Sequence, residues 1–246
     1  MTGTLGNAPG LPAPRVRAMV DRVPFLDQEL FVLDDFLPVG GTMVDVGAAG
    51  GVHALVGARR VGPTGRVVAI EARPGSAAIL RGWRTLLGLD QVTILSTAVG
   101  ARPGSLELRT PVVPTRTHTD QGEMPASDGW LAKLPSRVRT VGMTTLDLVV
   151  SSQGLARLDL VKVDVEGAEL EVLAGGAATF EAFRPTVVIE VEDRHLRRNG
   201  RTAAEVLAWF HERSYGAHVL GRHGLVAVDQ VTDAHNNYVF VPRPGA

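Results

Sequence analysis

A glycine-rich turn follows the first strand-like apolar segment of the chain, and an acid ends the second. Gly47 and Gly51 come directly after Thr42–Val46, and Glu71 closes Arg66–Glu71. In doubly wound α/β sheets, such glycines let backbone N–H groups approach a ligand, and the acid binds ribose hydroxyls. The pattern predicts a site for an adenosine-containing ligand. The residues expected to contact it are Asp45, Gly47, Ala48, Ala49, Gly51, Glu71, Ala72 and Thr97.

The spacing within this turn favours S-adenosylmethionine (SAM) over a dinucleotide. The segment reads D-x-G-x-A-x-G from Asp45, and Ala49 and Val52 stand where the dinucleotide pattern G-x-G-x-x-G needs its second and third glycines. A pyrophosphate requires that turn and a helix N-terminus. SAM has no phosphate, and an acid near the turn suits its ammonium group. An NAD-dependent oxidoreductase and a turn without any ligand remain the alternatives.

Further acids collect after two later apolar segments, 158–165 and 186–192. Asp164 lies at the end of the first, and Glu192 and Asp193 lie at the end of the second. Ligands of open α/β sheets bind outside the carboxyl ends of the strands. We therefore expect Asp164 to be the main catalytic residue. Glu192 and His195 are the other catalytic candidates, and His118 and His235 are further candidate bases.

Two chemistries fit these carboxylates. One of the candidates could remove a proton from an acceptor as a general base. Alternatively, Asp164, Glu192 and Asp193 could together bind Mg²⁺, which would lower the pKa of the acceptor oxygen. Lys162 shares a strand face with Asp164 and must be paired if buried. We expect it to pair with Glu190 or an acid beside it, which would leave Asp164 and Glu192 facing the cleft.

The elements that would position these residues form one α/β domain. Apolar runs predict seven strands in a mostly parallel sheet with helices on both faces, at 42–46, 66–71, 92–95, 158–165, 186–192, 218–220 and 237–241. Helices are expected at 53–60, 74–87, 167–173 and 202–213, and exposed strands at 105–109 and 137–141. Residues 1–14 are interpreted as a flexible tail and 15–246 as one domain. Within it, 15–40 form a helical cap and the long polar segment 110–136 a substrate lid.

Composition excludes several classes of function. The 246 residues carry a net charge of −1, with no long Lys/Arg run, so neither nucleic acid nor an anionic membrane surface is an expected partner. No apolar run approaches the ~18 residues of a membrane span. The absence of cysteine fits a reducing compartment, and we expect a cytoplasmic protein. The expected partner is a small-molecule acceptor, and a homo-oligomer is left open.

Five segments give the chain a resemblance to a known family, the FkbM family of SAM-dependent methyltransferases. They are 44–53, 65–74, 145–147, 160–169 and 236–238, and the most specific is the Lys-x-Asp-x-Glu-Gly-Ala-Glu block that begins at Lys162. The resemblance implies a seven-stranded class I (Rossmann-like) methyltransferase fold. It also implies methylation of a hydroxyl on a small or carbohydrate-like acceptor, often in natural-product assembly. N- or C-methylation and a non-catalytic SAM- or nucleotide-binding subunit are the alternatives.

The chain departs from this family at one position of the turn. Ala49 stands where the family usually has asparagine. A methyl side chain cannot form hydrogen bonds, so any SAM contact at this position would come from the backbone alone.

Overall fold

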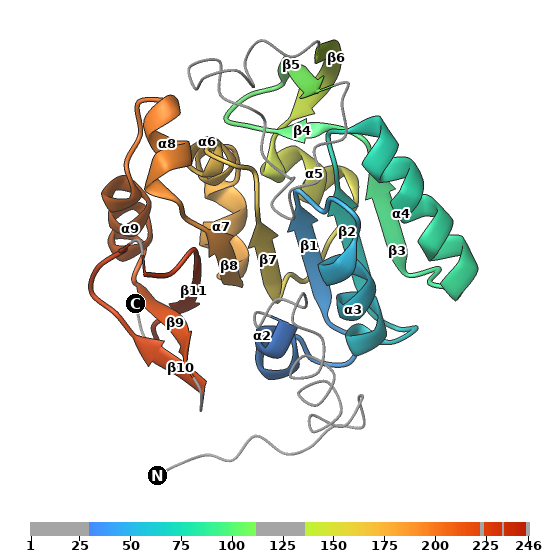
Figure 1. The fold of residues 1–246 in the computed structure, drawn as a ribbon. Helices are drawn as coiled ribbons and strands as arrows, with labels where there is room; N and C mark the ends of the chain where they lie inside the picture. The colour runs from blue at the N-terminus through green and yellow to red at the C-terminus, as the bar shows by residue number, and fades with distance from the viewer. Residues whose placement is uncertain (1–29, 112–135, 222–223, 233, 245–246) are drawn as a thin grey trace.

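A central sheet of eight strands organises the protein. The computed structural model describes residues 30–111, 136–221, 224–232 and 234–244. The strand order is β10-β9-β11-β8-β7-β1-β2-β3 (Figure 1). The strands are β1 (Thr42–Val46), β2 (Arg66–Ile70), β3 (Val92–Leu95), β7 (Leu160–Val163), β8 (Thr186–Glu190), β9 (Tyr215–Gly221), β10 (Gly224–Ala227) and β11 (Asn237–Pro242).

Five of these strands are mutually parallel, and their carboxyl ends meet at one edge. β3, β2, β1, β7 and β8 pair in parallel in that order, whereas β11 pairs antiparallel with both β8 and β9. β1 and β7 lie in the middle and are completely buried. Near-continuous apolar strands of this kind are typical of a parallel sheet covered on both faces.

Helices cover both faces of the sheet. One face packs against α2 (Leu30–Phe36), α3 (Val52–Val61) and α4 (Pro74–Leu87) through a core that includes Met43, Val67 and Leu160. The opposite face, which includes Val44, packs against the remaining helices. They are α5 (Leu146–Ser152), α6 (Glu169–Gly175), α7 (Ala177–Phe183), α8 (Asp193–Arg198) and α9 (Ala203–Glu212).

A second, three-stranded sheet lies beyond the carboxyl edge of the main sheet (Figure 1). It has the order β4-β6-β5, with β4 (Ala98–Val99), β5 (Gly104–Pro111) and β6 (Ser136–Thr144). β5 and β6 form a long antiparallel pair. The small sheet therefore adjoins the end at which an α/β sheet binds its ligands.

The structure confirms the α/β class and corrects the number of strands from seven to eight. The additional strand is β10, which pairs antiparallel with β9 at the outer edge of the sheet. Its four residues, Gly-Leu-Val-Ala, are all half-buried or exposed, and so short a segment was not recognised as a strand. The helices α7 and α8 were not predicted either, and at seven and six residues they are too short for clear periodicity.

Three predicted segments fall wholly or largely outside the described residues. The flexible tail at 1–14 and nearly all of the lid at 110–136 are among them. The expected cap at 15–40 is described only from Leu30, where α2 begins and packs on α3. These three interpretations therefore stay predictions.

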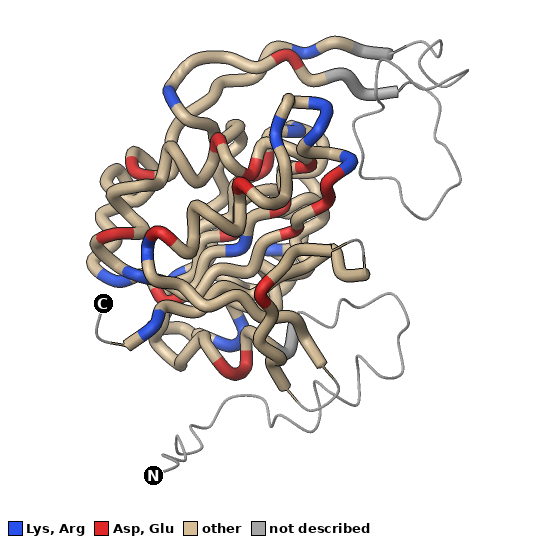
Figure 2. Tube along the Cα trace, turned by 90° about the vertical axis from the view of Figure 1, so that its left-hand side faces the viewer, with Lys and Arg blue, Asp and Glu red and all other residues tan. Residues whose placement is uncertain are grey.

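Acidic and basic positions are interspersed over the described part of the trace in Figure 2. None of the helices in the described ranges is long and apolar enough to cross a bilayer.

Candidate functional site

The glycine turn after β1 is held in a conformation that requires glycine. Gly47 and Gly51 have φ angles of 82° and 90°, in the left-handed region that only glycine adopts without strain. A Cβ at Gly47 would lie 1.8 Å from the carbonyl oxygen of Asp164, and one at Gly51 would lie 2.1 Å from Leu80 Cδ1. The predicted need for glycine thus has a cause within the protein itself, because the turn packs tightly against β7's loop and α4.

Ala49 departs from this pattern, because it is left-handed without being glycine. Its φ is 45°, a region in which Asn is better tolerated than Ala. Its N–H donates to Glu71 Oε2 at 2.7 Å. The backbone of Ala49 is thereby directed at the residue predicted to hold the ribose.

Glu71 joins the two loops that were predicted to hold the cofactor. Only 3% of it is exposed. Beside the bond from Ala49, its Oε1 accepts hydrogen bonds from Arg73 N at 2.7 Å and from Arg73 Nε at 3.2 Å. Three of the carboxylate's roughly four acceptor positions are therefore used, and the longer bond comes from a side chain that is 37% exposed. Displacing the Arg73 side chain would leave two positions for ribose hydroxyls.

Asp45 is the penultimate residue of β1, two positions before Gly47. It is 1% exposed, and burial raises its pKa to about 6, while the charge of Lys162 acts in the opposite direction. The N–H of Ala54 bonds to the carboxyl group, but in the described part of the chain Oδ2 has no hydrogen-bond partner. An unpaired buried carboxylate oxygen is costly, and a bound cationic group or water would satisfy it.

Lys162, Asp164 and Glu190 form a cluster of ionisable side chains where β7 and β8 end. Lys162 is 3% exposed, and its Nζ lies 2.7 Å from Asp164 Oδ2. Lys162 was expected to pair with Glu190 or an acid beside it and to leave Asp164 facing the cleft, whereas the structure pairs it with Asp164. Glu190 shares a hydrogen bond with Asp164.

The protonation states of the two carboxyls in this cluster differ. Burial, together with the charges of Asp164 and Glu192, raises the pKa of Glu190 to about 8. Burial also acts to raise the pKa of Asp164, but the charge and hydrogen bond of Lys162 outweigh it and leave that pKa below its usual value. At neutral pH Asp164 is therefore ionised, and the protonated Glu190 donates to it.

His53 lies close enough to Lys162 and Asp164 for their charges to affect its pKa, although it was not among the predicted site residues. It lies in the first turn of α3, directly after the glycine turn. Burial lowers its pKa to about 3, and the nearby Lys162 charge acts in the same direction. The imidazole is therefore neutral at physiological pH. Its position after Gly51 was the only available signal.

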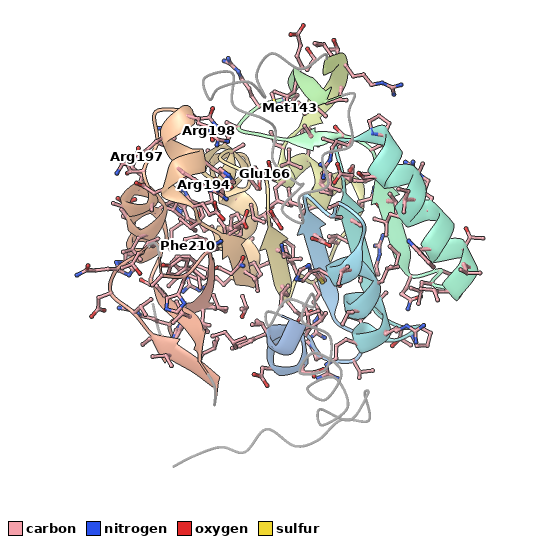
Figure 3. The ribbon with its side chains drawn as sticks, in the orientation of Figure 1. Met143, Glu166, Arg194, Arg197, Arg198 and Phe210 are labelled. Carbon is pink, nitrogen blue, oxygen red and sulfur yellow. The ribbon has the colours of Figure 1, made fainter. Side chains whose placement is uncertain are left out.

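Glu192 and His195, which were also predicted to be catalytic, interact with each other and with residues other than Asp164. Glu192 accepts hydrogen bonds from Arg194 Nε and, at 2.7 Å, from Asn236 Nδ2. His195 lies in α8 with 8% exposed, and its Nε2 is 3.6 Å from Glu192 Oε2. Burial lowers the pKa of His195. In Figure 3, the labelled Arg194 lies on α8, and the labelled Glu166 lies in the loop that follows β7.

The three predicted Mg²⁺ ligands are not gathered into one site. Asp193 accepts from Arg197 Nε and from Ala203 N, the latter at 3.1 Å, which ties it to the start of α9. Asp164 is paired with Lys162, and Glu192 with Arg194. Within the described ranges, no group of three or more Asp, Glu or His side chains is arranged to hold a metal ion. The Mg²⁺ hypothesis therefore has no support from the geometry.

Two predicted cofactor residues lie at the margin of the site. Ala72 is half-buried between Glu71 and Arg73. Thr97 donates its hydroxyl hydrogen bond to the carbonyl oxygen of Gly142 at 2.8 Å, and so helps to hold the small sheet. The backbone around these residues could line a ligand, and their roles stay predictions.

The Glu-Gly-Ala-Glu loop after β7 is fixed by contacts with α8. Glu166 has a φ of 52° and Gly167 one of 107°. A Cβ at Gly167 would lie 2.6 Å from the carbonyl oxygen of His195, and Asn199 Nδ2 donates to Gly167 O at 2.8 Å. The buried Glu169 accepts from Gly167 N at 2.8 Å. This strained, closely packed loop holds Asp164 at the carboxyl edge.

Comparisons with known proteins identify the family of the chain. The family model described as "Methyltransferase FkbM domain" matches residues 45–217. A curated relative is the AMB antimetabolite synthetase AmbE of Pseudomonas aeruginosa. The two are 28% identical in an alignment over 267 residues, and this alignment covers 92% of this chain. The chain spans only 12% of that synthetase's length.

A solved structure of low sequence identity shows the same fold, and a second one is similar to a lesser degree. A methyltransferase FkbM from Methylobacillus flagellatus is 15% identical, with a TM-score of 0.52 over 92% of this chain and 58% of that one. A SAM-dependent methyltransferase from Aquifex aeolicus is 13% identical, with a TM-score of 0.48 over 94% of this chain and 99% of that one.

Proposed function

The chain belongs to the FkbM methyltransferase family, and from that premise we propose that it transfers the methyl group of SAM to a hydroxyl oxygen of a small-molecule acceptor. The observation that carries the proposal is the bond of buried Glu71 to the N–H of Ala49, which joins the acid after β2 to the glycine turn after β1. This is the constellation expected to hold the adenosine part of SAM.

The residues present fit SAM. Glu71 would accept the ribose hydroxyls once Arg73 Nε has moved aside, and the left-handed Gly47 and Gly51 leave two positions of the turn without a side chain. Asp45 offers a buried carboxylate oxygen without a partner in the described residues, close to where an ammonium group is expected. Bound SAM would supply a methyl group already activated by its cationic sulfur.

Asp164 is the residue we propose for proton removal. It is held ionised by Lys162, and its side chain is 37% exposed, so an acceptor can reach it. It would accept a hydrogen bond from the acceptor hydroxyl and take that proton as the oxygen–methyl bond forms. Glu190, protonated at neutral pH, and Lys162 would fix the orientation of the Asp164 carboxylate.

A small-molecule acceptor is supported by the relative's printed name, an antimetabolite synthetase, and by the near-neutral charge of this chain. A carbohydrate-like or natural-product hydroxyl fits both. Because the chain spans 12% of that synthetase, the acceptor of the relative is not carried over.

The test is a binding and transfer experiment with the purified protein. Isothermal titration should detect SAM binding and no NADH binding. Incubation with methyl-labelled SAM and matched hydroxyl and amine acceptors should then label hydroxyl compounds. Labelled amines would establish N-methylation instead. If SAM binds but no acceptor in the panel becomes methylated, a non-catalytic subunit would be favoured. NADH binding would favour an oxidoreductase.

A further inference from the structure

Helix α4 carries an apolar stripe on its outer surface that the described residues leave uncovered. Ile79, Trp83 and Leu86 are 58%, 45% and 73% exposed, and Leu87 is 36% exposed. Only Ala77 and Leu80 of this helix are buried. Of the ten exposed large apolar residues in the described ranges, four lie on these fourteen positions. Scattered exposed residues need no explanation, but a concentrated patch marks an interaction surface.

The exposed residues share one face of the helix. Ile79, Trp83 and Leu86 follow the i, i+4, i+7 spacing of a single stripe. Gly82 lies in the same stripe, and a Cβ there would meet no atom within 4 Å. The polar Arg81 and Thr85 fall on another face at 100° per residue. α4 lies beside β3, which is the edge strand of the sheet (Figure 1).

The stripe is symmetric about its own centre. Reading Ile79-x-x-Gly82-Trp83-x-x-Leu86 from either end places a large aliphatic residue at each outer position. If two copies of α4 cross antiparallel about the midpoint between Gly82 and Trp83, Ile79 of one faces Leu86 of the other. Trp83 of each then lies over Gly82 of its partner, where the absent side chain leaves room.

We propose that this stripe, defined by Ile79, Gly82, Trp83 and Leu86, is the contact surface between two copies of this chain in a twofold-symmetric dimer. Such an isologous contact requires one patch to be complementary to itself, and the stripe meets that condition. A tryptophan packed into a gap at the centre is also the usual composition of an interface hot spot.

The small size of the stripe limits the expected affinity of the dimer. A pair of fourteen-residue helices, each about 21 Å long, buries less than the ~1,200–2,000 Å² of a standard stable interface. We therefore expect a dimer that dissociates on dilution. Sedimentation equilibrium from about 1 to 200 µM should show the mass rising from 26.1 kDa toward twice that value.

Trp83→Glu should raise the dissociation constant at least tenfold, because it places a carboxylate at the centre of the contact. Leu148→Glu is the matched control, since Leu148 is 49% exposed on α5, which packs on the opposite face of the sheet. That control should dimerise as the wild type does. A wild-type protein that stays monomeric at 200 µM, or a dimer that Trp83→Glu leaves unchanged, would overturn the proposal.

Cysteine cross-linking tests the register of the two α4 helices, and the chain has no native cysteine that would react as well. A chain with both Ile79→Cys and Leu86→Cys should form covalent dimers with a short bismaleimide, because these positions face each other across the twofold axis. Ile79→Cys alone should not, since two copies of position 79 would lie about 10 Å apart along the axis before their lateral separation is added. Efficient cross-linking of the single variant would contradict the antiparallel arrangement.

Discussion

Lys162 Nζ, near the end of β7, lies 2.7 Å from Oδ2 of Asp164, the first residue after this strand. The lysine is almost completely buried, whereas the aspartate side chain is 37% exposed. A buried ammonium group must be paired, and here its partner faces the site. The ion pair therefore keeps Asp164 ionised at the position where an acceptor would bind.

Asp164→Asn should reduce methyl transfer by about 10²–10⁴-fold, because the amide cannot take a proton. SAM affinity should change little, since Asp164 is not among the residues expected to hold the cofactor. Turnover with labelled SAM and titration of SAM measure the two effects separately. Asp90→Asn is the control, because that side chain is fully exposed. Wild-type turnover in Asp164→Asn would remove Asp164 from the mechanism.

Chelation should leave turnover unchanged. Asp193 is tied to the start of α9, and Glu192 is paired with Arg194, so neither is available beside Asp164 as a metal ligand. Activity measured before and after dialysis against EDTA checks this expectation. Loss of activity that Mg²⁺ restores would show that these carboxylates rearrange around a metal.

Glu190→Gln should change how stability depends on pH. The folded protein raises the pKa of Glu190 from 4.5 to about 8, chiefly through burial, so the native state binds the proton more tightly than the unfolded state does. This contribution is complete below pH 4.5 and is lost as pH rises through about 8. Glutamine keeps the donor and cannot ionise. Between pH 5 and 8 the variant should lose less unfolding free energy than the wild type, by on the order of 1 kcal/mol after solvent screening.

Denaturant unfolding of both proteins at the two pH values measures this difference. Equal pH dependence in the wild type and Glu190→Gln would mean that Glu190 is ionised throughout this range. The hydrogen bond to Asp164 would then need a different donor.

Gly47→Ala should destabilise the protein by more than about 2 kcal/mol, because its Cβ would lie 1.8 Å from the carbonyl oxygen of Asp164 at a positive φ. Gly50→Ala is the matched control in the same turn, since a Cβ there would meet nothing within 4 Å. Thermal melts compare the two. Equal melting temperatures for the two variants would contradict the described turn geometry.

The sequence predicted the parallel centre of the fold well, because its strands are continuous apolar runs. β1 and β3 were predicted with the bounds that the structure has, and so was α4 with Pro74 at its start. β10 was missed because it has only four residues and begins with a glycine, which is too little for a clear strand pattern. The expectation that acids gather at the carboxyl edge follows from topology alone.

The pairing within the site could not be predicted in the same way. Which acid meets Lys162 depends on where β7 ends, and it ends at Val163, so Asp164 lies in the loop rather than in the strand. The electrostatic interaction of His53 with Lys162 and Asp164 depends on how α3 packs beside these residues. Contacts of this kind, between residues far apart in the chain, produce no recognisable pattern in the sequence.

The proposed function depends on Glu71 and the glycine turn holding SAM. Isothermal titration of SAM into the wild type and Glu71→Gln tests this binding, and Glu107→Gln, which changes an exposed acid on β5, is the control. Two charge-assisted hydrogen bonds at about 1.5–3 kcal/mol each predict at least a tenfold loss of affinity in Glu71→Gln and none in the control. A folded Glu71→Gln protein that binds SAM as tightly as the wild type would contradict the account.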